Sequence, residues 1–384
     1  MGRINLKQDV FSAAVERMRV LFAEGHRVVV SFSAGKDSGC SVEICLIAMK
    51  LAGQGNAGSP KLDVVMRDEE ILFPGSFEYA ERMAARPDVN FRWLVAGQPI
   101  INIFNRAAPY WWVFDKRLPP EKWVRQPPAF AEWIPDNNIA AISTTARFPP
   151  PPGKDLIRVQ GLRAAESQRR LMGVHAARGY LTRPIAPNFR GASPIYDWRD
   201  EDVWKAISDN KWDMNTAYDV MFRMGVPKKG LRIAPPTLNP ASASSLAIAQ
   251  KAWPRWFDLV AERLPGVRTA AQFGARVCQP YRRYGETWEQ CFWRECVTDA
   301  PPWVADRSRE MAAWLKDMHS RHSTTEVPER VACTACHGPV KTWRKLAEAM
   351  YSGDPFALKA NLDYVQPEFF REGAGQWTGD PACP

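Results

Sequence analysis

One short stretch restricts the fold of this chain more than any other. Three consecutive valines at 28–30 predict a buried strand, and positions 31–38 then read Ser-Phe-Ser-Ala-Gly-Lys-Asp-Ser. An apolar helical pattern begins directly afterwards, at Val42, Cys45, Leu46 and Met49. A strand, a loop of small residues and a helix amino terminus together suit a phosphate group, because converging N–H groups and the helix dipole favour an anion there.

The loop is not a common P-loop. That motif has a glycine at fixed spacing before its Gly-Lys pair and a serine or threonine directly after the lysine. Here these two positions hold Val30 and Asp37. The order Ser-x-Gly-x-Asp-Ser instead resembles the PP-loop of the adenine nucleotide alpha-hydrolase superfamily, which includes N-type ATP pyrophosphatases and phosphoadenosine-phosphosulfate (PAPS) reductases. The alternative is an ordinary turn between a strand and a helix.

The resemblance implies roles for the loop residues. Ser33, Gly35 and Ser38 would line a pyrophosphate, Lys36 would offset its charge, and Asp37 would lie near Mg²⁺. The nucleotide-binding set implied in this way is Ser31, Phe32, Ser33, Ala34, Gly35, Lys36, Asp37 and Ser38, with catalytic roles for Lys36, Asp37 and Ser38. Family members usually have glycine in place of Ala34, and we expect the added methyl group to require a negative φ and to crowd the loop slightly.

Bulk properties limit the class of protein. With 384 residues, 46% hydrophobic and 24% charged, the chain has the composition of an ordinary globular protein and the length of about two domains. It has no apolar run long enough to span a membrane and no secretory pattern at its amino terminus, so we expect a cytoplasmic protein without membrane contact. The net charge of +9 favours an anionic partner, either a nucleotide or a nucleic acid.

Strand and helix patterns alternate through the first part of the chain. This alternation predicts an α/β fold with a parallel sheet, and the resemblance implies a Rossmann-like (HUP-type) nucleotide-binding domain. We expect that domain at 1–235, with a Trp- and Pro-rich insertion at 99–153, and a mostly helical, cysteine-containing domain at 236–384. Asp68 and Glu69 follow the second predicted strand, and ligands of parallel sheets bind at such strand ends.

A second candidate phosphate site follows a later predicted strand. Residues 161–170 read Gly-Leu-Arg-Ala-Ala-Glu-Ser-Gln-Arg-Arg, and helical spacing brings Arg163, Glu166 and Arg170 to one face. Arginine suits phosphate or sulfate, although a solvated basic helix end has the same pattern. The segment resembles the Gly-x-Arg-x-x-Glu-Ser-x-x-Arg element of PAPS-reductase-like proteins. The resemblance implies nucleotide contacts from Gly161, Arg163, Glu166, Ser167 and Arg170.

Further segments narrow the branch of the family. Residues 194–204 and 215–219 look like the Pro-Ile-x-Asp-Trp segment and the following helix of that family. The insertion is similar to a branch found in phages and bacteria, often encoded beside a ParB-like protein, which implies such a partner. PAPS reductases proper use the cysteine of a carboxyl-terminal Glu-Cys-Gly-x-His motif, and Thr334–Gly338 does not match it.

Four of the eight cysteines form two pairs in the carboxyl-terminal region. The pairs Cys291/Cys296 and Cys333/Cys336 predict a four-thiolate site for Zn²⁺ or a 4Fe-4S cluster, with Cys278 and His337 as reserve ligands. Unpaired buried cysteines and a redox dithiol are the alternatives. We expect His319 and His322 to lie on the surface of the preceding helix.

Three functions follow from these features. The leading hypothesis is an enzyme that binds ATP or PAPS with Mg²⁺ and activates an acceptor by adenylylation, or sulfurates it, the acceptor being a nucleic acid or another target. The second is a thiol-dependent PAPS reductase. The third is a nucleotide-sensing module that regulates a ParB-like DNA-binding partner without turnover.

Overall fold

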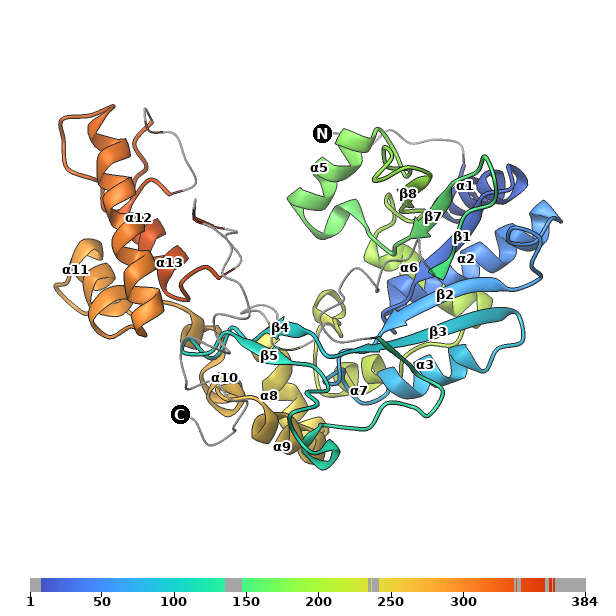
Figure 1. Ribbon diagram of the computed structural model, residues 1–384, viewed down its shortest axis with the longest axis horizontal. Helices are drawn as coiled ribbons and strands as arrows, with labels where there is room; N and C mark the ends of the chain where they lie inside the picture. Colours follow the sequence, from blue (N-terminus) through green and yellow to red (C-terminus); the bar gives the residue numbers. More distant parts are fainter. Residues whose placement is uncertain are drawn as a thin grey trace. The chain divides into compact units, whose positions relative to one another are not determined.

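A six-stranded parallel sheet forms the framework of the amino-terminal part. The computed structural model describes residues 8–134, 147–233, 236, 242–334, 336, 340–355, 359–360 and 362. The strand order is β6-β3-β2-β1-β7-β8, and each paired strand runs parallel to its neighbour (Figure 1). The strands are β1 Arg27–Ser31, β2 Leu62–Arg67, β3 Val89–Ala96, β6 Glu132–Ile134, β7 Leu156–Val159 and β8 Phe189–Ala192. This architecture confirms the predicted α/β, Rossmann-like class.

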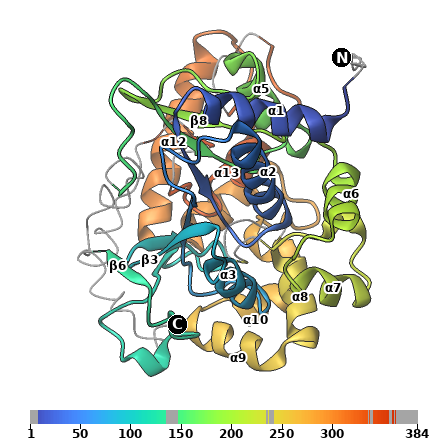
Figure 2. The same ribbon diagram turned by 90° about the vertical axis from the view of Figure 1, so that its right-hand side faces the viewer.

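Helices accompany these strands. They are α1 Val10–Ala23, α2 Lys36–Ala52, α3 Ser76–Ala84, α5 Gln168–Ala177, α6 Asp200–Asn210 and α7 Ala217–Arg223, with short 3-10 turns η3 Ala164–Glu166 and η4 Lys228–Gly230. Helix α1 lies beside α2, and both contact α6 (Figure 2). Helix α2 ends at Ala52, and its C-cap Gly53 has a φ of +74°, the left-handed conformation that glycine adopts without a Cβ clash.

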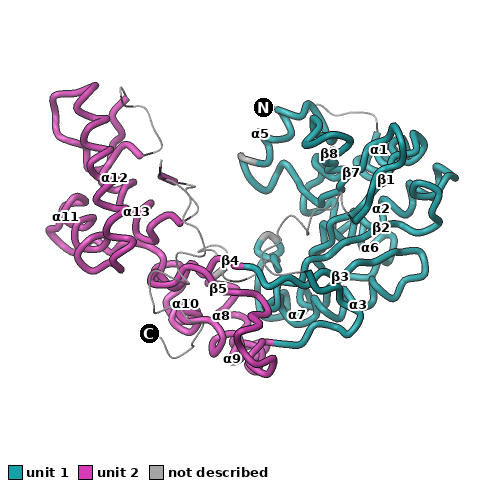
Figure 3. The backbone as a smooth tube through the Cα atoms, in the orientation of Figure 1, with its two compact units in different colours: residues 1–98, 125–234 teal, residues 99–124, 235–384 magenta. Residues whose placement is uncertain are grey.

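The chain forms two compact units (Figure 3). Unit 1 contains residues 1–98 and 125–234, and unit 2 contains residues 99–124 and 235–384. One division thus falls beside the boundary predicted at residue 235. The predicted insertion at 99–153 is itself divided, because residues 99–124 belong to unit 2 and the rest to unit 1.

The order of the strands reverses at β1. From this strand the sheet continues through β2, β3 and β6 on one side, and through β7 and β8 on the other. In open parallel sheets, ligands bind beyond the carboxyl ends of the strands at such a reversal. The loops that leave β1 and β7 at this edge are the two candidate phosphate sites, at residues 31–38 and 161–170.

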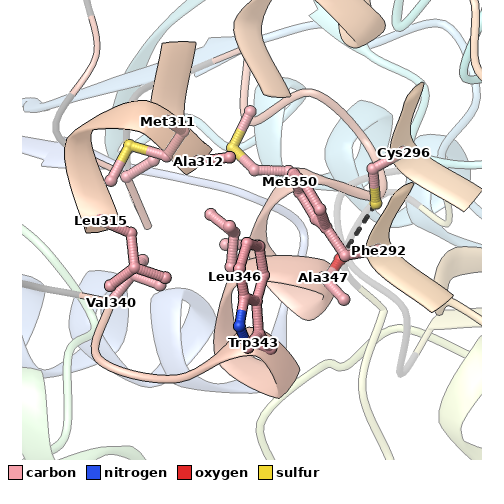
Figure 4. Close-up of a cluster of buried hydrophobic side chains, with 12 residues drawn as sticks. Phe292, Cys296, Met311, Ala312, Leu315, Val340, Trp343, Leu346, Ala347 and Met350 are labelled. Carbon is pink, nitrogen blue, oxygen red and sulfur yellow. Dashed lines mark hydrogen bonds between the residues drawn. The ribbon is translucent and has the colours of Figure 1, made fainter. Parts of the chain in front are cut away.

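Unit 2 is helical in its described carboxyl-terminal part. It contains α8 Ser242–Ala252, α9 Pro254–Arg263, α10 Val267–Phe273, η5 Gly274–Cys278, α11 Trp288–Trp293, the π-helical turn η6 Arg294–Thr298, α12 Pro302–Ser320 and α13 Trp343–Met350. Side chains from α11, η6, α12 and α13 form one buried cluster around Phe292, Met311 and Leu346 (Figure 4). Among the helices of the described ranges, none combines the length and apolar character needed to cross a membrane.

Residues 99–124 are built into unit 2 by contacts distant in sequence. They form a hairpin of β4 Pro99–Ile101 and β5 Tyr110–Trp112, followed by the 3-10 turn η1 Pro120–Lys122. The Asn102 amide donates to the carbonyl of Pro265 at 2.9 Å, and the Trp303 indole donates to the carbonyl of Arg106 at 3.2 Å. The aromatic side chains of the hairpin region are buried: Tyr110, Trp111, Trp112 and Phe114.

A substitution of Gly266 tests the packing of residues 99–124 within unit 2. Its φ is +88°, and a Cβ on it would lie 2.5 Å from the carbonyl oxygen of Phe104. We expect Gly266→Ala to lower the free energy of unfolding by about 3 kcal/mol or more, since backbone strain and a backbone clash add. Gly285→Ala is the control, because φ is +75° there and no atom lies within 4 Å of the Cβ position. It should cost about 1–2 kcal/mol. Equal losses in denaturant titrations would contradict this docking of the hairpin.

Candidate functional site

The loop after β1 is held together by hydrogen bonds of its own serines, Ser33 and Ser38. Helix α2 begins at Lys36, and its N-cap Gly35 offers no side chain to the first N–H groups. The Ser38 hydroxyl donates to the Gly35 carbonyl at 2.9 Å and accepts from the backbone N–H of Ser33 at 3.2 Å. The two serine hydroxyl oxygens also lie 3.2 Å apart. The predicted residues Ser33 to Ser38 therefore form a compact turn at a helix amino terminus.

Ala34 corrects one sequence expectation. We expected its methyl group to require a negative φ, but φ is +56° and the side chain is buried. A left-handed backbone costs a non-glycine residue about 1–2 kcal/mol. The buried Asn215 side chain holds the strained turn, because its amide donates to the Ala34 carbonyl at 3.0 Å and to the Ser76 hydroxyl at 2.8 Å. Alanine therefore occupies the conformation for which glycine is usual.

Two buried cations and two carboxylates meet beside the loop. Lys36 and Arg163 are each only 5% exposed. The Lys36 Nζ lies 3.4 Å from Asp37 Oδ2 and 3.2 Å from Asp200 Oδ1. The Arg163 guanidinium forms ion pairs with the same two aspartates, at 2.7 Å to Asp37 and 3.2 Å to Asp200. We call Lys36, Asp37, Arg163 and Asp200 the charge cluster.

Gly161 allows the two loops to touch. A Cβ on this residue would lie 2.7 Å from the carbonyl carbon of Asp37 and 2.8 Å from the backbone nitrogen of Ser38. Such contacts are shorter than real Cβ atoms make, so only glycine fits without movement. The close approach is what places Arg163, two residues further along, within reach of Asp37.

The rest of the second segment surrounds Glu166. Ser167 caps α5 by accepting from the backbone N–H of Arg170 at 3.2 Å. Glu166 forms ion pairs with Arg170 and with Arg163, the latter at 3.6 Å. The carboxylate is therefore within reach of both guanidinium groups. The predicted helical spacing is not the reason, because the backbone is extended at Arg163 and Ser167 and α5 begins only at Gln168.

The Asp68 carboxylate interacts with neighbouring groups of the protein. It is fully buried and accepts from the Trp93 indole at 2.8 Å and from the backbone N–H of Glu70 at 2.9 Å. It also forms an ion pair with Arg125, whose pKa is lowered by burial. Glu69 pairs with Arg67 at 2.6 Å. Asp68 therefore ties the end of β2 to neighbouring side chains, and its nucleotide contact stays a prediction.

Three residues of the site were not among the predicted ligands. Asp200, at the start of α6, completes the charge cluster and accepts from the Trp204 indole at 3.1 Å. The buried Tyr218 hydroxyl accepts from the backbone N–H of Lys36 at 3.0 Å, and burial raises its pKa. Asn215 supports Ala34. All three lie in the segments 194–204 and 215–219, so the resemblance contained a signal for them that the spacing alone did not.

The cysteines are arranged differently from the predicted four-thiolate set. Ligand atoms of His319, Cys333 and Cys336 lie within 4.8 Å of one another, and this group does not include Cys291 or Cys296. Cys291 is buried, and Cys296 belongs to the helical core, where its thiol donates to the Ala347 carbonyl at 3.7 Å (Figure 4). The expectation of a surface position is wrong for His319, which is 3% exposed. The reserve ligand His337 lies outside the described residues.

A separate cavity of about 500 Å³ occurs elsewhere in unit 1. It is lined by Arg27, Asn90, Phe91, Arg92, Trp93, Phe130, Glu132 and Arg147. Its arginines are already paired, Arg27 with Asp63 and the other two with Glu132. We therefore place the candidate site at the charge cluster and not in this cavity.

Comparison with known proteins gives one relative in sequence and several in structure. No family model matches the chain. It is 23% identical to the uncharacterized protein YbdN of Escherichia coli (strain K12), over 92% of this chain and 90% of that protein. That similarity spans both units but carries no stated function.

The solved structures that resemble this chain include FMN adenylyltransferases and a PAPS reductase. An FMN adenylyltransferase of Candida glabrata, in complex with FMN and an ATP analogue, is 15% identical with a TM-score of 0.33 over 56% of this chain. The match spans 63% of that enzyme, less than two thirds of its length. A PAPS reductase of Candida auris is 12% identical with a TM-score of 0.34, over 57% of this chain and 95% of that one. Similarities this low do not define an activity.

The contact at Gly161 gives a prediction for stability. Gly161→Ala should lower the free energy of unfolding by about 1–3 kcal/mol, because the new Cβ must push the backbone of Asp37 and Ser38 away. Gly173→Ala in α5 is the control, since no atom lies within 4 Å of its Cβ position and alanine favours a helix by up to about 1 kcal/mol. Chemical denaturation of both variants measures the difference. A Gly161→Ala protein as stable as the control would show that the loops are not in contact.

Proposed function

We propose that unit 1 binds an adenine nucleotide, ATP or PAPS, together with Mg²⁺ at the loop 31–38, and that the protein is an enzyme acting on the bound nucleotide. One observation carries this proposal. The charge cluster lies at the reversal of strand order, where it joins Lys36 and Asp37 at the amino terminus of α2 to Arg163 from the loop after β7.

The site offers an anion several complementary groups. The helix dipole of α2 adds a partial positive charge at this amino terminus, where the Lys36 N–H is already bonded to Tyr218. Lys36 and Arg163 add two full positive charges that the fold already holds at low exposure. A phosphate group entering here would compete with Asp37 and Asp200 for these cations, and arginine would bind it through two parallel N–H donors.

The same exchange would free the two carboxylates for a cation. Asp37 and Asp200 both lie within 3.5 Å of the Lys36 ammonium group, so their oxygens approach a common point. Mg²⁺ prefers carboxylate and phosphate oxygens together with water. Bound there, Mg²⁺ would supply Lewis-acid stabilisation of phosphate charge. Asp37 and Asp200 are the residues of this chain that would hold it.

The residues suit transfer of an adenylyl group. An acceptor oxygen would attack the α-phosphorus of ATP, the bond between α-phosphorus and bridging oxygen would break, and pyrophosphate would leave with the electron pair. The Ser33–Ser38 turn and Lys36 would stabilise the negative charge that develops on this leaving group. A sulfur nucleophile can then attack the acceptor atom that carries the adenylylated oxygen, so that the bond to this oxygen breaks and AMP leaves with the electron pair. This is the sulfurating form of the proposal. A nucleic acid remains among the proposed acceptors.

The sulfonucleotide reductase alternative requires a reactive thiolate. Cys336, the cysteine considered for this role, is only 1% exposed. A thiol so poorly accessible suits nucleophilic attack badly. This observation favours the ATP-dependent form over direct PAPS reduction.

Substitutions in the charge cluster test the proposal. Asp37→Asn and Asp200→Asn keep the shape of each side chain and remove its charge, and Ser38→Ala removes the hydroxyl that closes the turn. We expect each to lower nucleotide turnover by about 10²-fold or more, the usual cost of losing one preorganised charge-stabilising group. Turnover is measured as AMP and pyrophosphate released from ATP, and as sulfite released from PAPS when thiol is present.

Asp209→Asn is the matched control. Asp209 lies on α6 with Asp200, but its carboxylate is exposed and pairs only with the exposed Lys205 in the described contacts. It should leave turnover unchanged. Wild-type protein that binds neither nucleotide would overturn the proposal. Tight binding without any product would instead support a nucleotide-sensing module for a ParB-like partner.

A further inference from the structure

Three metal-ligating side chains converge in unit 2, in a group that the nucleotide site does not involve. His319 ends the buried face of α12, and Cys333 and Cys336 follow in the segment that leads to α13. Their ligand atoms lie within 4.8 Å of one another, and the Nδ1 of His319 is 3.1 Å from the Sγ of Cys336. In a tetrahedral zinc site with bonds of about 2.0–2.3 Å, neighbouring ligand atoms stand about 3.5–3.8 Å apart. Small movements would therefore bring all three atoms to one ion.

The histidine is oriented for this purpose. Its second ring nitrogen, Nε2, lies 3.4 Å from the hydroxyl oxygen of Thr325, which in turn lies 2.8 Å from the hydroxyl of Ser323. If Nε2 carries the proton and donates to Thr325, the lone pair of Nδ1 points to the cysteines. A hydrogen bond from the far ring nitrogen is the usual means by which proteins fix the tautomer of a metal-binding histidine.

The donor set selects the kind of metal. Two thiolates and one imidazole, with C-x-x-C spacing between the cysteines, are typical of zinc. A cubane iron–sulfur cluster takes four cysteine thiolates, and neither Cys291 nor Cys296 belongs to this group. Two thiolates also balance the charge of a divalent ion, so a neutral centre would result in a buried place.

We propose that His319, Cys333 and Cys336 bind one Zn²⁺ ion, which fastens the segment 321–336 to the end of α12. This segment contains turns and bends but no helix or strand over its described residues. It leads into Val340 and Trp343 of the helical core. A metal joining residues 319 and 336 would close a loop of this length and fix the entry to α13, which stabilises the folded state by the free energy of metal binding.

The experiment measures zinc in the full-length protein. After dialysis against buffer with trace zinc, the wild type should hold about one equivalent per chain, by elemental analysis. Cys333→Ser, Cys336→Ser and His319→Ala should each retain about a tenth of an equivalent or less. His319→Cys should restore binding, because three thiolates also suit zinc. Thr325→Val should keep the metal with an affinity lowered by about tenfold, as expected for a group that only orients a ligand.

Cys291→Ala is the control that separates the two candidate ligand sets. It should hold as much zinc as the wild type. If it loses zinc as fully as Cys336→Ser, the four-thiolate set is correct and this proposal falls.

A measurement on the wild-type protein tests the proposal even if some of the variants do not fold. Alkylation of the partly exposed Cys333, mapped by mass spectrometry, should be slow with zinc and fast after chelation. Replacement by Co²⁺ should produce thiolate-to-metal absorption that the chelator abolishes. Absence of stoichiometric metal with alkylation indifferent to zinc, or a Cys333–Cys336 disulfide in the purified protein, would overturn the proposal.

Discussion

The candidate site depends on the parallel pairing of β1 with β7. Val30 stands opposite Val159 in this pairing, so the two strands end at the same level and their loops leave the sheet side by side. Gly161 then lets the second loop rest on the backbone of the first. Two segments separated by more than a hundred residues thereby share one set of charges. A shift in the register of β7 would remove Arg163 from Asp37 and with it the whole arrangement.

The charge cluster is a coupled set and not a sum of pairs. Lys36 and Arg163 are buried cations, which are costly to remove from water unless carboxylates or other anions compensate them. Each cation contacts both aspartates, so the loss of one carboxylate leaves two cations only partly balanced. This coupling suits a site that exchanges one anion for another, because the cations remain in place while their partners change.

The sequence predicted the features that arise from neighbours in the chain. The valine run lies in β1, the serine-rich loop follows that strand, and Gly161 follows β7, as these local patterns predicted. The φ of Ala34 was predicted with the wrong sign, because it depends on Asn215, which lies 181 positions away. The burial of His319 was missed for the same kind of reason, since the last turn of a helix looks exposed until the returning segment that covers it is known.

Local sequence patterns also could not predict to which compact unit residues 99–124 belong. The aromatic residues of 99–124 indicated order, but not what they pack against, because their partners, such as Pro265 and Trp303, lie far along the chain. Composition therefore predicted one continuous insertion at 99–153. In the structure, residues 99–124 belong to unit 2 and the rest of that range belongs to unit 1.

Residues 99–124 belong to unit 2 although unit 1 continues after them in the sequence, and this has a consequence for the design of protein fragments. A truncated protein ending at residue 234 would keep this hairpin and lose the helices that cover it, leaving Tyr110, Trp111, Trp112 and Phe114 in water. Exposed aromatic strands of this kind promote self-association. An isolated unit 1 would need a short polar bridge from Gln98 to Arg125 in place of the hairpin, and an isolated unit 2 would need the hairpin grafted ahead of α8.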